Sequence, residues 1–504
     1  MSSYGPMIDP GARRAAFPKH IGIINDYVRI PYANGSSFAS QFLYREFVRR
    51  GHGVTVLGPR DPETGPADLP RSAVLFESLP LRNHPGVFLA LPSPRALADA
   101  ERLGLDVVLA QTGSGLLDLG IWLRARARVP LLCVNTIHLP SVYNVLLPDR
   151  LHARASVLEL FDEAVIPKVE RLTASAYNLS DGVVVLSEGL ARYWRERGVT
   201  VPIHVIPRPV DPRIFDRPSE RDPFPAAAPR GGRLLCVCRH SREKNVARLI
   251  RIFAEHLAPK LPNATLTLVG DGPDHDSFRA LAEELRVADR VFFVGEFPVT
   301  EVADFYRAAD VFVYASLSET YGQVVSEALY CGLPVVAFRD DMGVSHQLDR
   351  VLPGLVVDPG PDTVERDLEF GSLVRDLLEN VPRRRALGHH AAEVARERSR
   401  PELAIARHYD AFEAAREHCL RNPPPTGASK RLLPIARWTA LHVVLAAFGH
   451  LRPPAILNRH GRTQPTWEAL VNTPAAAPPE RRVRAPREIP LRPEPVVPPA
   501  SLLS

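Results

Sequence analysis

The chain has few cysteines and no long apolar segment. Its five cysteines are Cys133, Cys236, Cys238, Cys331 and Cys419. Most of them lie in apolar runs, so neither a disulfide framework nor a four-ligand zinc site is indicated. The first residues lack a basic segment followed by an apolar one, and no uncharged apolar run reaches about 20 residues. These absences favour a reducing compartment and predict a cytoplasmic protein without a membrane-spanning helix.

The composition that is present fits soluble globular domains. Hydrophobic residues make up 45% of the chain and charged residues 24%. A chain of 504 residues is longer than a single hydrophobic core usually supports, so two domains are expected.

The positive charge is concentrated in the last part of the chain. The net charge is +5, but residues 421–504 alone hold 12 Lys and Arg against 4 Asp and Glu, a balance of +8 that leaves about −3 for the rest. This tail also contains 16 of the 50 prolines, and disorder is predicted after about Ala469. Within it, residues 432–451 form a helical pattern with Trp438 and Phe448 on one stripe. This helix either lies on an anionic membrane surface or packs onto the protein body.

Short apolar runs alternate with helical patterns along the body. The first series of predicted strands covers residues 20–25, 54–57, 106–110, 131–135, 182–186 and 203–206. The second series covers residues 233–238, 265–269, 291–294, 311–313 and 335–337, after a Pro-rich stretch at 211–229. This order predicts an α/β fold with two doubly wound, Rossmann-like halves. A helical pattern at 402–420 follows the second series and is expected to pack across one or both halves.

Two carboxylates stand eight positions apart after the predicted strand that ends near Ala315. Glu319 falls in a loop or first helical turn, and Glu327 about two turns further on, which is roughly 12 Å if the rise is helical throughout. A right-handed crossover places this loop at the carboxyl edge of the sheet, where open α/β sheets bind ligands. Glu319 and Glu327 would then bind sugar and ribose hydroxyls, while Gly322 lets phosphate approach the backbone. Alternatively, Glu319 only caps the helix and Glu327 is an ordinary exposed residue.

Basic residues and one histidine follow other strands. Arg239 and Lys244 come directly after the first strand of the second series, where both can reach a diphosphate, although such a cluster is often only a solvated turn. His138 follows the predicted strand 131–135 and faces the cleft between the halves if that strand runs like its neighbours. A single histidine in such a place is more often structural.

These segments together resemble the retaining glycosyltransferases of family 4, which have the GT-B fold. The resemblance rests on residues 318–322 with 327–328 and 332–335, Arg239 with Lys244, residues 269–273, and the loop at 34–35 with residues 50–52, and it covers roughly residues 20–420. It implies residues 20–205 as an N-terminal acceptor domain after a 1–19 extension. It also implies 206–400 as the donor domain, 401–420 as a helix that crosses back, and 421–504 as the tail.

The resemblance also implies roles for individual residues. Glu319 would bind the donor sugar, Glu327 the ribose, and Arg239 with Lys244 the diphosphate, with no metal or other cofactor. His138 would contact the sugar near the reacting carbon, and Gly35 would approach the phosphates. The remaining donor-binding residues would be Thr320, Tyr321, Gly322 and Gly295, the last of these near the base.

The mechanism implied is front-face transfer with retention of the anomeric configuration. The leaving diphosphate would be stabilised by the two basic residues, and its oxygen would take the acceptor proton. Three positions depart from the family pattern: Cys238 replaces a common Gly, Leu139 a Thr, and Arg208-Pro209 a turn often written Asn-Gly. The carboxylate and basic pairs are intact.

The donor and the acceptor are less constrained. UDP-sugars and GDP-mannose both fit, and the N-terminal pattern is most similar to members that glycosylate membrane lipids such as diacylglycerol or phosphatidylinositol. The chain would then be peripheral on the inner face of the membrane. The alternatives are a soluble or polysaccharide acceptor and, from another class, a catalytically silent nucleotide-sugar-binding protein. Nucleic-acid binding is not supported because the basic tail lacks interleaved aromatics. The oligomeric state is left open.

Overall fold

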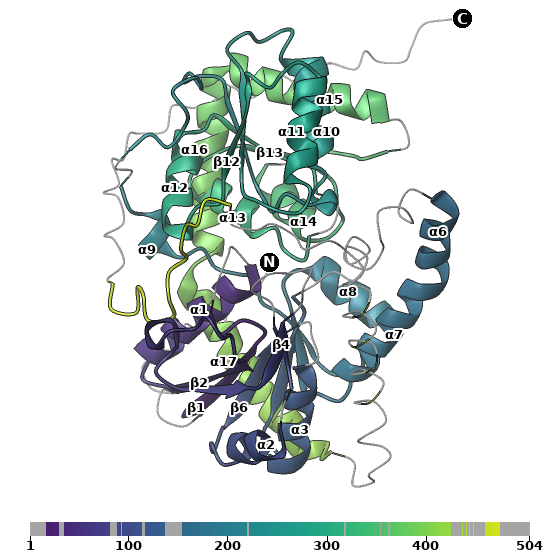
Figure 1. The fold of residues 1–504 in the computed structure, drawn as a ribbon, viewed down its shortest axis with the longest axis vertical. Coiled ribbons are helices and arrows are strands. Elements are labelled where there is room, and N and C mark those ends of the chain that lie inside the picture. The colour runs from purple at the N-terminus through teal and green to yellow at the C-terminus, as the bar shows by residue number, and fades with distance from the viewer. Residues whose placement is uncertain are drawn as a thin grey trace, which may run out of the picture.

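The computed structural model describes most of the body of the chain and one segment of the tail. The described residues are 17–29, 35–80, 88–91, 93–112, 116–136, 154–218, 221–316, 319–352, 354–360, 363–424 and 459–473, with four isolated positions at 436, 440, 443 and 447. Figure 1 shows two lobes, one above the other, each built around its own sheet.

The N-terminal lobe contains a parallel sheet of seven strands in the order β3-β2-β1-β6-β7-β8-β9. The strands are β1 (His20–Asn25), β2 (Gly53–Pro59), β3 (Ala73–Phe76), β6 (Val107–Gln111), β7 (Leu131–Val134), β8 (Gly182–Val185) and β9 (Ile203–Val205). A small antiparallel pair, β4 (Ser78–Pro80) and β5 (Phe88–Ala90), lies beside it. All predicted strands of this series are present, whereas β3 was not predicted because most of its residues are only partly buried.

The C-terminal lobe contains a parallel sheet of six strands in the order β12-β11-β10-β13-β14-β15. The strands are β10 (Arg233–Val237), β11 (Thr265–Val269), β12 (Val291–Gly295), β13 (Val311–Tyr314), β14 (Val335–Phe338) and β15 (Val356–Val357). The five predicted strands are confirmed, and β15 escaped prediction because two residues give no readable pattern. The prediction of two doubly wound halves is therefore confirmed.

Helices cover both sheets. Those of the N-terminal lobe are α1 (Gly35–Arg49), α2 (Pro94–Glu101), α3 (Leu117–Ala127), α6 (Ala155–Leu160), α7 (Ile166–Tyr177) and α8 (Glu188–Glu196). After α9 (Pro212–Phe215) in the connection, the C-terminal lobe has α10 (Val246–Ile252), α11 (His275–Glu284), α12 (Val299–Ala308), α13 (Gln323–Tyr330), α14 (Gly343–Val351), α15 (Thr363–Glu379) and α16 (Val381–Arg398).

Both sheets reverse their strand order at a single point. In the N-terminal lobe the order reverses between β1 and β6, and in the C-terminal lobe it reverses between β10 and β13. Loops that leave the carboxyl ends of strands on either side of such a point diverge, which opens a crevice for a ligand. The residues that follow β1, β10 and β13 are therefore the first places to look for a site.

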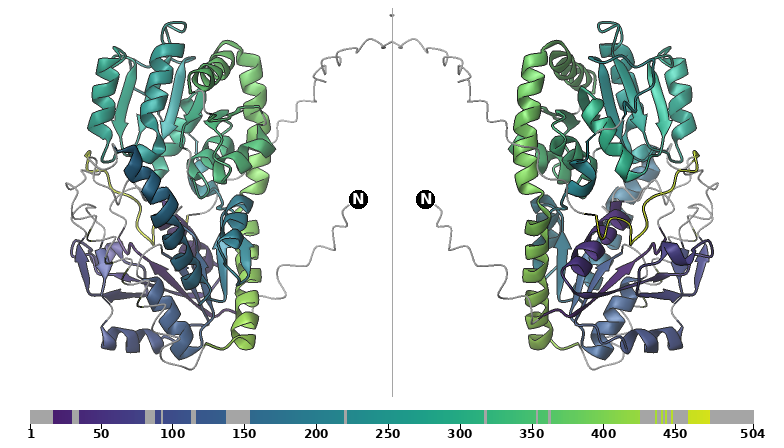
Figure 2. Two further views of the ribbon diagram at one scale, coloured as in Figure 1. Left: turned by 90° about the vertical axis from the view of Figure 1, so that its right-hand side faces the viewer. Right: turned by 90° about the vertical axis from the view of Figure 1, so that its left-hand side faces the viewer.

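The last helix crosses from one lobe to the other, as the resemblance implied. α17 (Pro401–Arg421) buries Ile405 and Phe412 in the apolar cluster of the N-terminal sheet. Figure 2 shows α17 along one side of the molecule, in line with the helices of the C-terminal lobe. The N-terminal lobe is thus completed by residues that come after the whole C-terminal lobe in the sequence.

A segment of the tail also packs onto the body. The prediction of disorder after about Ala469 falls almost entirely on residues 474–504, which lie outside the described residues. We call residues 459–473 the strap. In it Trp467 is 1% exposed and Val471 4% exposed, and both belong to the N-terminal core cluster. These two large apolar residues anchor the strap although it lies in a Pro-rich region. Burial of each side chain stabilises the packed state by about 1.5–3 kcal/mol. The predicted helix at 432–451 lies outside the described residues apart from the four isolated positions.

Membrane crossing was also assessed for the part of the chain that the structure describes. In these ranges none of the helices combines the length and the apolar character that a bilayer span requires.

Candidate functional site

Two loops at the carboxyl edge of the C-terminal sheet bring the predicted basic and acidic residues together. After β10, the chain passes Arg239 and turns through a short 3-10 helix, Arg242–Lys244, which ends at Asn245 in the left-handed conformation with φ of 55°. Asn tolerates this conformation better than most residues, so the turn reverses sharply and returns Lys244 toward the sheet. The neighbouring loop, after β13, carries Glu319.

Lys244 and Glu319 form an ion pair inside this crevice. The Nζ of Lys244 donates to Oε1 of Glu319, and the hydroxyl of Tyr314, at the end of β13, donates to the same oxygen at 2.7 Å. Burial alone would lower the pKa of Lys244, but the carboxylates of Glu319 and Glu243 outweigh it and raise the pKa. Lys244 therefore carries its charge at neutral pH. The sequence placed both residues at one site but did not predict that they bind each other.

Arg239 is held by a second carboxylate. Its Nη2 lies 2.8 Å from Oε1 of Glu243 and its Nε donates to Oγ of Ser241 at 3.2 Å, while Ser241 donates to Glu243 at 2.6 Å. Burial pushes the pKa of Glu243 upward, yet the charges of Arg239 and Lys244 outweigh it and hold the pKa at about 2. The guanidinium is thus oriented by a permanently charged partner, and its side chain is still 40% exposed at the edge of the sheet.

Glu327 differs from its prediction in position and in burial. α13 begins only at Gln323, so Glu327 lies about one turn into the helix and the helical distance of roughly 12 Å to Glu319 does not apply. Its carboxylate is 8% exposed and accepts a hydrogen bond from the hydroxyl of Tyr306 at 2.9 Å. Burial raises the pKa of Glu327 to about 7, and hydrogen bonds from Tyr306 and Gln323 only partly offset this rise. It is therefore not an ordinary exposed helix residue.

The turn before α13 depends on a glycine. Gly322 has φ of 77°, and a Cβ there would lie 2.8 Å from Cγ2 of Val344. Any other residue would be strained and would displace α14. Thr320 is partly exposed beside it. The ring of Tyr321 instead packs into an apolar cluster of the N-terminal lobe with Leu186, so its position indicates a contact between the lobes rather than a contact with a donor.

Gly35 faces the C-terminal lobe from the other side of the crevice. It is the first residue of α1, and a Cβ on it would lie 3.1 Å from Nη1 of Arg208. Burial lowers the pKa of Arg208 to about 10, opposed by Glu319 and Tyr321, so the guanidinium is charged at neutral pH. The free N–H groups of a helix N-terminus and a guanidinium both favour an anion. The sequence singled out Arg208 only as a departure from a family pattern.

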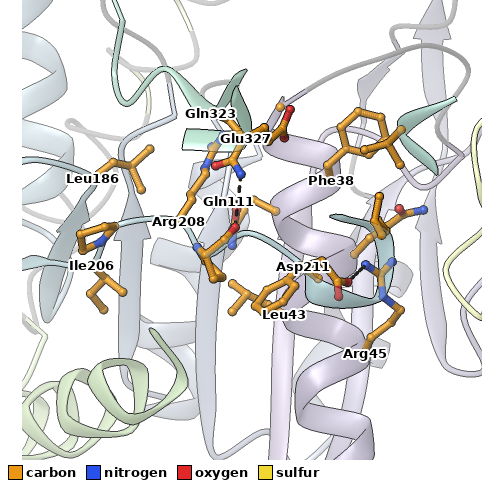
Figure 3. Close-up of a pocket in the computed structure, with 18 of the residues that line it drawn as sticks. Phe38, Leu43, Arg45, Gln111, Leu186, Ile206, Arg208, Asp211, Gln323 and Glu327 are labelled. Atoms are coloured by element: carbon orange, nitrogen blue, oxygen red, sulfur yellow. Dashed lines mark hydrogen bonds and ion pairs between the residues drawn. The ribbon is translucent and has the colours of Figure 1, made fainter. Parts of the chain in front are cut away.

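A cavity between the lobes is lined by Gly35, Arg208 and Glu327, whereas Lys244, Glu319 and Arg239 lie outside its lining. The cavity has a volume of about 100 Å³ and is partly open to solvent. Figure 3 shows Arg208, Gln323 and Glu327 gathered at one place in this cavity, with Leu43 of α1 next to Asp211 on another side of it. Most of the other lining residues are apolar. The site combines a few charged groups with apolar walls, as ligand pockets commonly do.

Other predicted site residues lie elsewhere or outside the described chain. His138 and Ser318 fall outside the described residues. Gly295 ends β12 with φ of 79°, and a Cβ on it would lie 2.1 Å from Nδ1 of His460, so the strap lies directly against it. Within the ranges described above, no three His, Cys, Asp or Glu side chains are grouped to hold a metal ion.

Sequence reasoning missed several residues of this site, among them Arg208, Glu243, Tyr306, Tyr314 and Gln323. The two tyrosines sit in apolar patterns that are read as core, and their hydroxyls reach the two carboxylates only through the fold. Gln323 could have been found from its position in the sequence, because it lies between the two carboxylates and directly after Gly322.

Two family models match consecutive parts of the chain. Residues 34–214 match "Glycosyltransferase Family 4", and residues 220–394 match "Glycosyl transferases group 1". The chain belongs to glycosyltransferase family 4. The matched regions coincide with the two lobes, and the resemblance found in the sequence is confirmed. The strap lies beyond both matched regions.

Individual relatives of this family 4 glycosyltransferase share about a third of their aligned residues with it or fewer. It is 28% identical over 333 residues to the alpha-monoglucosyldiacylglycerol synthase of Streptococcus pneumoniae, covering 63% of this chain and 70% of the relative. It is 31% identical to D-inositol 3-phosphate glycosyltransferase 1 of Catenulispora acidiphila over 276 residues, which are 52% of this chain and 62% of the relative. The crystal structure of Anabaena HepE in complex with UDP and glucose has a TM-score of 0.58, with 17% identity, 78% of this chain covered and 98% of HepE. At that identity the match shows the shared GT-B fold.

Proposed function

We propose that this glycosyltransferase moves a hexose from a nucleotide-diphosphate sugar to a hydroxyl group of a membrane lipid, of the diacylglycerol or phosphatidylinositol type. The observation that carries the proposal is the Lys244–Glu319 ion pair at the point where the C-terminal sheet reverses its strand order, with Arg239 on the same loop as Lys244. Glu327, at the start of the next helix, faces Gly35 across the cavity. A nucleotide-sugar donor is supported further by the UDP and glucose bound in the structural relative HepE.

The geometry supports a distinct task for each group. Glu319 holds the Lys244 ammonium in place, and because an ammonium has three N–H donors, Lys244 can bind a donor phosphate without releasing Glu319. Arg239 is oriented by Glu243 toward the same edge. Charge that develops on the leaving diphosphate then meets cations already in position, which is the most effective form of transition-state stabilisation. Glu327 binds ribose hydroxyls. The contact of His138 with the sugar is proposed from the family resemblance alone, since this residue lies outside the described residues.

We propose front-face transfer with retention and without a metal. The departing phosphate oxygen takes the proton of the acceptor hydroxyl on the face where the new bond forms, so no separate general base is required. Lys244, Arg239 and Arg208 supply the positive charge that a metal would otherwise bring to the diphosphate. The backbone near Gly322 and Thr320 completes the donor contacts.

The lipid acceptor is supported by one relative and by the charge of the tail. The Streptococcus pneumoniae relative is named for the synthesis of a glucosylated diacylglycerol. The balance of +8 in residues 421–504 favours an anionic membrane surface. A soluble acceptor is the second candidate, because relatives named D-inositol 3-phosphate glycosyltransferase have similar or higher identities over shorter stretches.

One experiment separates these candidates. The purified full chain is mixed with a panel of UDP-sugars and GDP-mannose, and the nucleotide-sugar that gives the largest thermal stabilisation is used as donor. Transfer is then measured to diacylglycerol or phosphatidylinositol in detergent and, in parallel, to inositol 3-phosphate. If product forms with the lipids and not with inositol 3-phosphate, the proposal is supported. If product forms with inositol 3-phosphate and not with the lipids, the soluble acceptor replaces the lipid. Donor binding without transfer or hydrolysis would leave a silent nucleotide-sugar-binding protein as the interpretation.

A further inference from the structure

The strap ties the two lobes together on the side opposite α17. Figure 2 shows α17 at one side of the molecule and the strap, in yellow, at the other, and in Figure 1 the strap runs from the upper to the lower lobe. Arg459 starts it on the C-terminal lobe, with its Nε 3.1 Å from Oδ1 of Asp271. The strap therefore closes one side of the crevice between the lobes.

The middle of the strap binds the backbone at the carboxyl end of β12. Arg462 donates to the carbonyl of Glu296 at 2.7 Å and stacks over the ring of Phe297 at 3.6 Å. Gln464 donates to the carbonyl of Phe297 at 3.2 Å and accepts from the N–H of Val299 at 3.2 Å. These backbone groups lie at the same edge of the sheet as the donor site.

The end of the strap is anchored in the N-terminal lobe. The indole N–H of Trp467 donates to the carbonyl of Val28, and its ring packs edge-on against Tyr44 with centroids 5.5 Å apart. Glu468 accepts from the Tyr44 hydroxyl and forms an ion pair with Arg71 at 3.2 Å. With both ends fixed, the residues between them have a defined position.

Two strap residues face the cavity between the lobes from this position. Pro465 and Leu470 line the same cavity as Glu327 and Arg208. Leu470 has φ of 67°, a conformation that is strained for a residue with a branched apolar side chain, and it packs against the core of the C-terminal lobe. The fold thus maintains an unfavourable backbone conformation at a position that places an apolar side chain in the cavity wall.

Unsatisfied polar atoms indicate that the cavity receives a polar ligand. Gln111 is 3% exposed, and within the described parts of the chain neither its Oε1 nor that of Gln323 has a hydrogen-bond donor. Both residues line the cavity. A nucleoside matches this mixture, because its hydroxyls can donate to the glutamine and glutamate oxygens while its flat base lies against apolar side chains.

We propose that the strap belongs to the donor site, where Pro465 and Leu470 form the wall against which the nucleoside of the donor packs. This inference rests on the proposed nucleotide-sugar donor. It assigns donor selection in part to a segment that lies outside both matched family regions. The base is then read by the strap as well as by the C-terminal sheet.

The test measures binding of UDP and GDP to the full chain by calorimetry. Leu470→Gly removes the wall and suits the left-handed conformation, so the fold is retained while the affinity for the preferred nucleotide falls about tenfold or more. Leu470→Met keeps an apolar wall and binds within a few-fold of the native chain. Asn472→Gly, at an exposed strap position that does not line the cavity, binds as the native chain does.

The outcomes are distinguishable from those of the proposed function. If the full chain binds neither nucleotide, the proposed donor class is wrong. If the full chain binds but Leu470→Gly binds equally well, the strap is not part of the donor site. Tighter binding by Leu470→Gly would also overturn the inference, since it would mean that the strap competes with the nucleoside. Thermal unfolding of each variant confirms that it is folded.

Discussion

The ammonium of Lys244 binds the carboxylate of Glu319 across 75 positions of sequence, from the loop after β10 to the loop after β13. The two loops flank the point at which the strand order of the sheet reverses. A charged lysine that is already paired with a glutamate differs from a free surface lysine, because the direction of its side chain is fixed before a ligand arrives. The pair therefore makes the two residues a single functional unit, and substitution of either one should affect the other.

Removal of Glu319 or Arg239 should reduce transfer strongly without unfolding the chain. We expect Glu319→Ala and Arg239→Ala each to lower kcat/KM by at least about a hundredfold, since each removes a charged contact near the reacting donor. Glu365→Ala, at an exposed position on α15, is the matched control and should retain activity. Near-normal turnover in either site variant would show that the reaction takes place elsewhere.

Glu327 should make both stability and donor binding depend on pH. Its pKa is raised from the ordinary value of 4.5 to about 7, so the native state holds a proton that the unfolded state has lost between these two values. Its contribution to stability is therefore present below about pH 4.5 and is lost as the pH rises toward 7, at a cost of about 3 kcal/mol. We expect Glu327→Gln to be stabilised relative to the native chain at pH 8 but not at pH 4.5, as measured by thermal unfolding.

The same variant separates binding from catalysis. Ribose contacts exist in both the ground state and the transition state, so Glu327→Gln should raise KM for the donor with little change in kcat. A loss confined to kcat would contradict the ribose role.

Activity should survive chelation and preserve the donor's anomeric configuration. Arg239, Lys244 and Arg208 place positive charge around the expected diphosphate position. We expect the same rate with and without excess EDTA, and NMR of the product should show the anomeric configuration of the donor. Loss of activity with EDTA and recovery with manganese or magnesium would count against this arrangement.

Trp467 should contribute to the stability of the N-terminal lobe. It is fully buried against Tyr44, so we expect Trp467→Ala to cost about 3–5 kcal/mol and to lower the thermal unfolding midpoint. Leu420→Ala, at an exposed position near the end of α17, serves as the control and should unfold as the native chain does. Truncation after Leu420 removes the same anchor, so we expect it to destabilise the protein as well. An unchanged midpoint in Trp467→Ala would show that the strap is not part of the core.

Membrane attachment should depend on basic residues that precede the strap. We expect the full chain to sediment with anionic liposomes at low salt, to be released as salt rises, and to bind neutral vesicles weakly. Replacing Lys430, Arg431, Arg437 and Arg452 with glutamine should weaken sedimentation, since each contributes about 1 kcal/mol before screening. Transfer to a detergent-solubilised acceptor should be retained. Sedimentation equal to that of the native chain would exclude these residues as the membrane contact.

The sequence was sufficient to predict most strands of the two parallel sheets and the kinds of residue that form the site. Strands buried on both faces appear as continuous apolar runs, which is why both parallel sheets were found and only the marginal β3 and β15 were missed. Glu319, Arg239 and Lys244 could be grouped because the carboxyl ends of parallel strands share one edge.

The other features of the site could not be predicted, because they depend on contacts between distant parts of the chain. No local pattern indicates that Tyr306 reaches Glu327, or that burial raises the pKa of that carboxylate. The same holds for Arg208, which follows β9 and approaches Gly35 of α1 only through the fold of the N-terminal lobe. The strap could not be recognised in the sequence because it lies within a basic, Pro-rich tail, and only the partners of Trp467 show that it packs onto the body.

The bond from Trp467 to Val28 spans 439 positions of sequence. At a synthesis rate of about 5–20 residues per second, the ribosome needs roughly 20–90 s to make the residues between them. Once β9 has been made, the part of the first sheet's face that α17 and the strap later cover stays open until those residues are synthesised, while α1 already packs on the rest of it. The half of the molecule that is translated first is therefore completed last, and its nascent apolar face is a natural substrate for a chaperone.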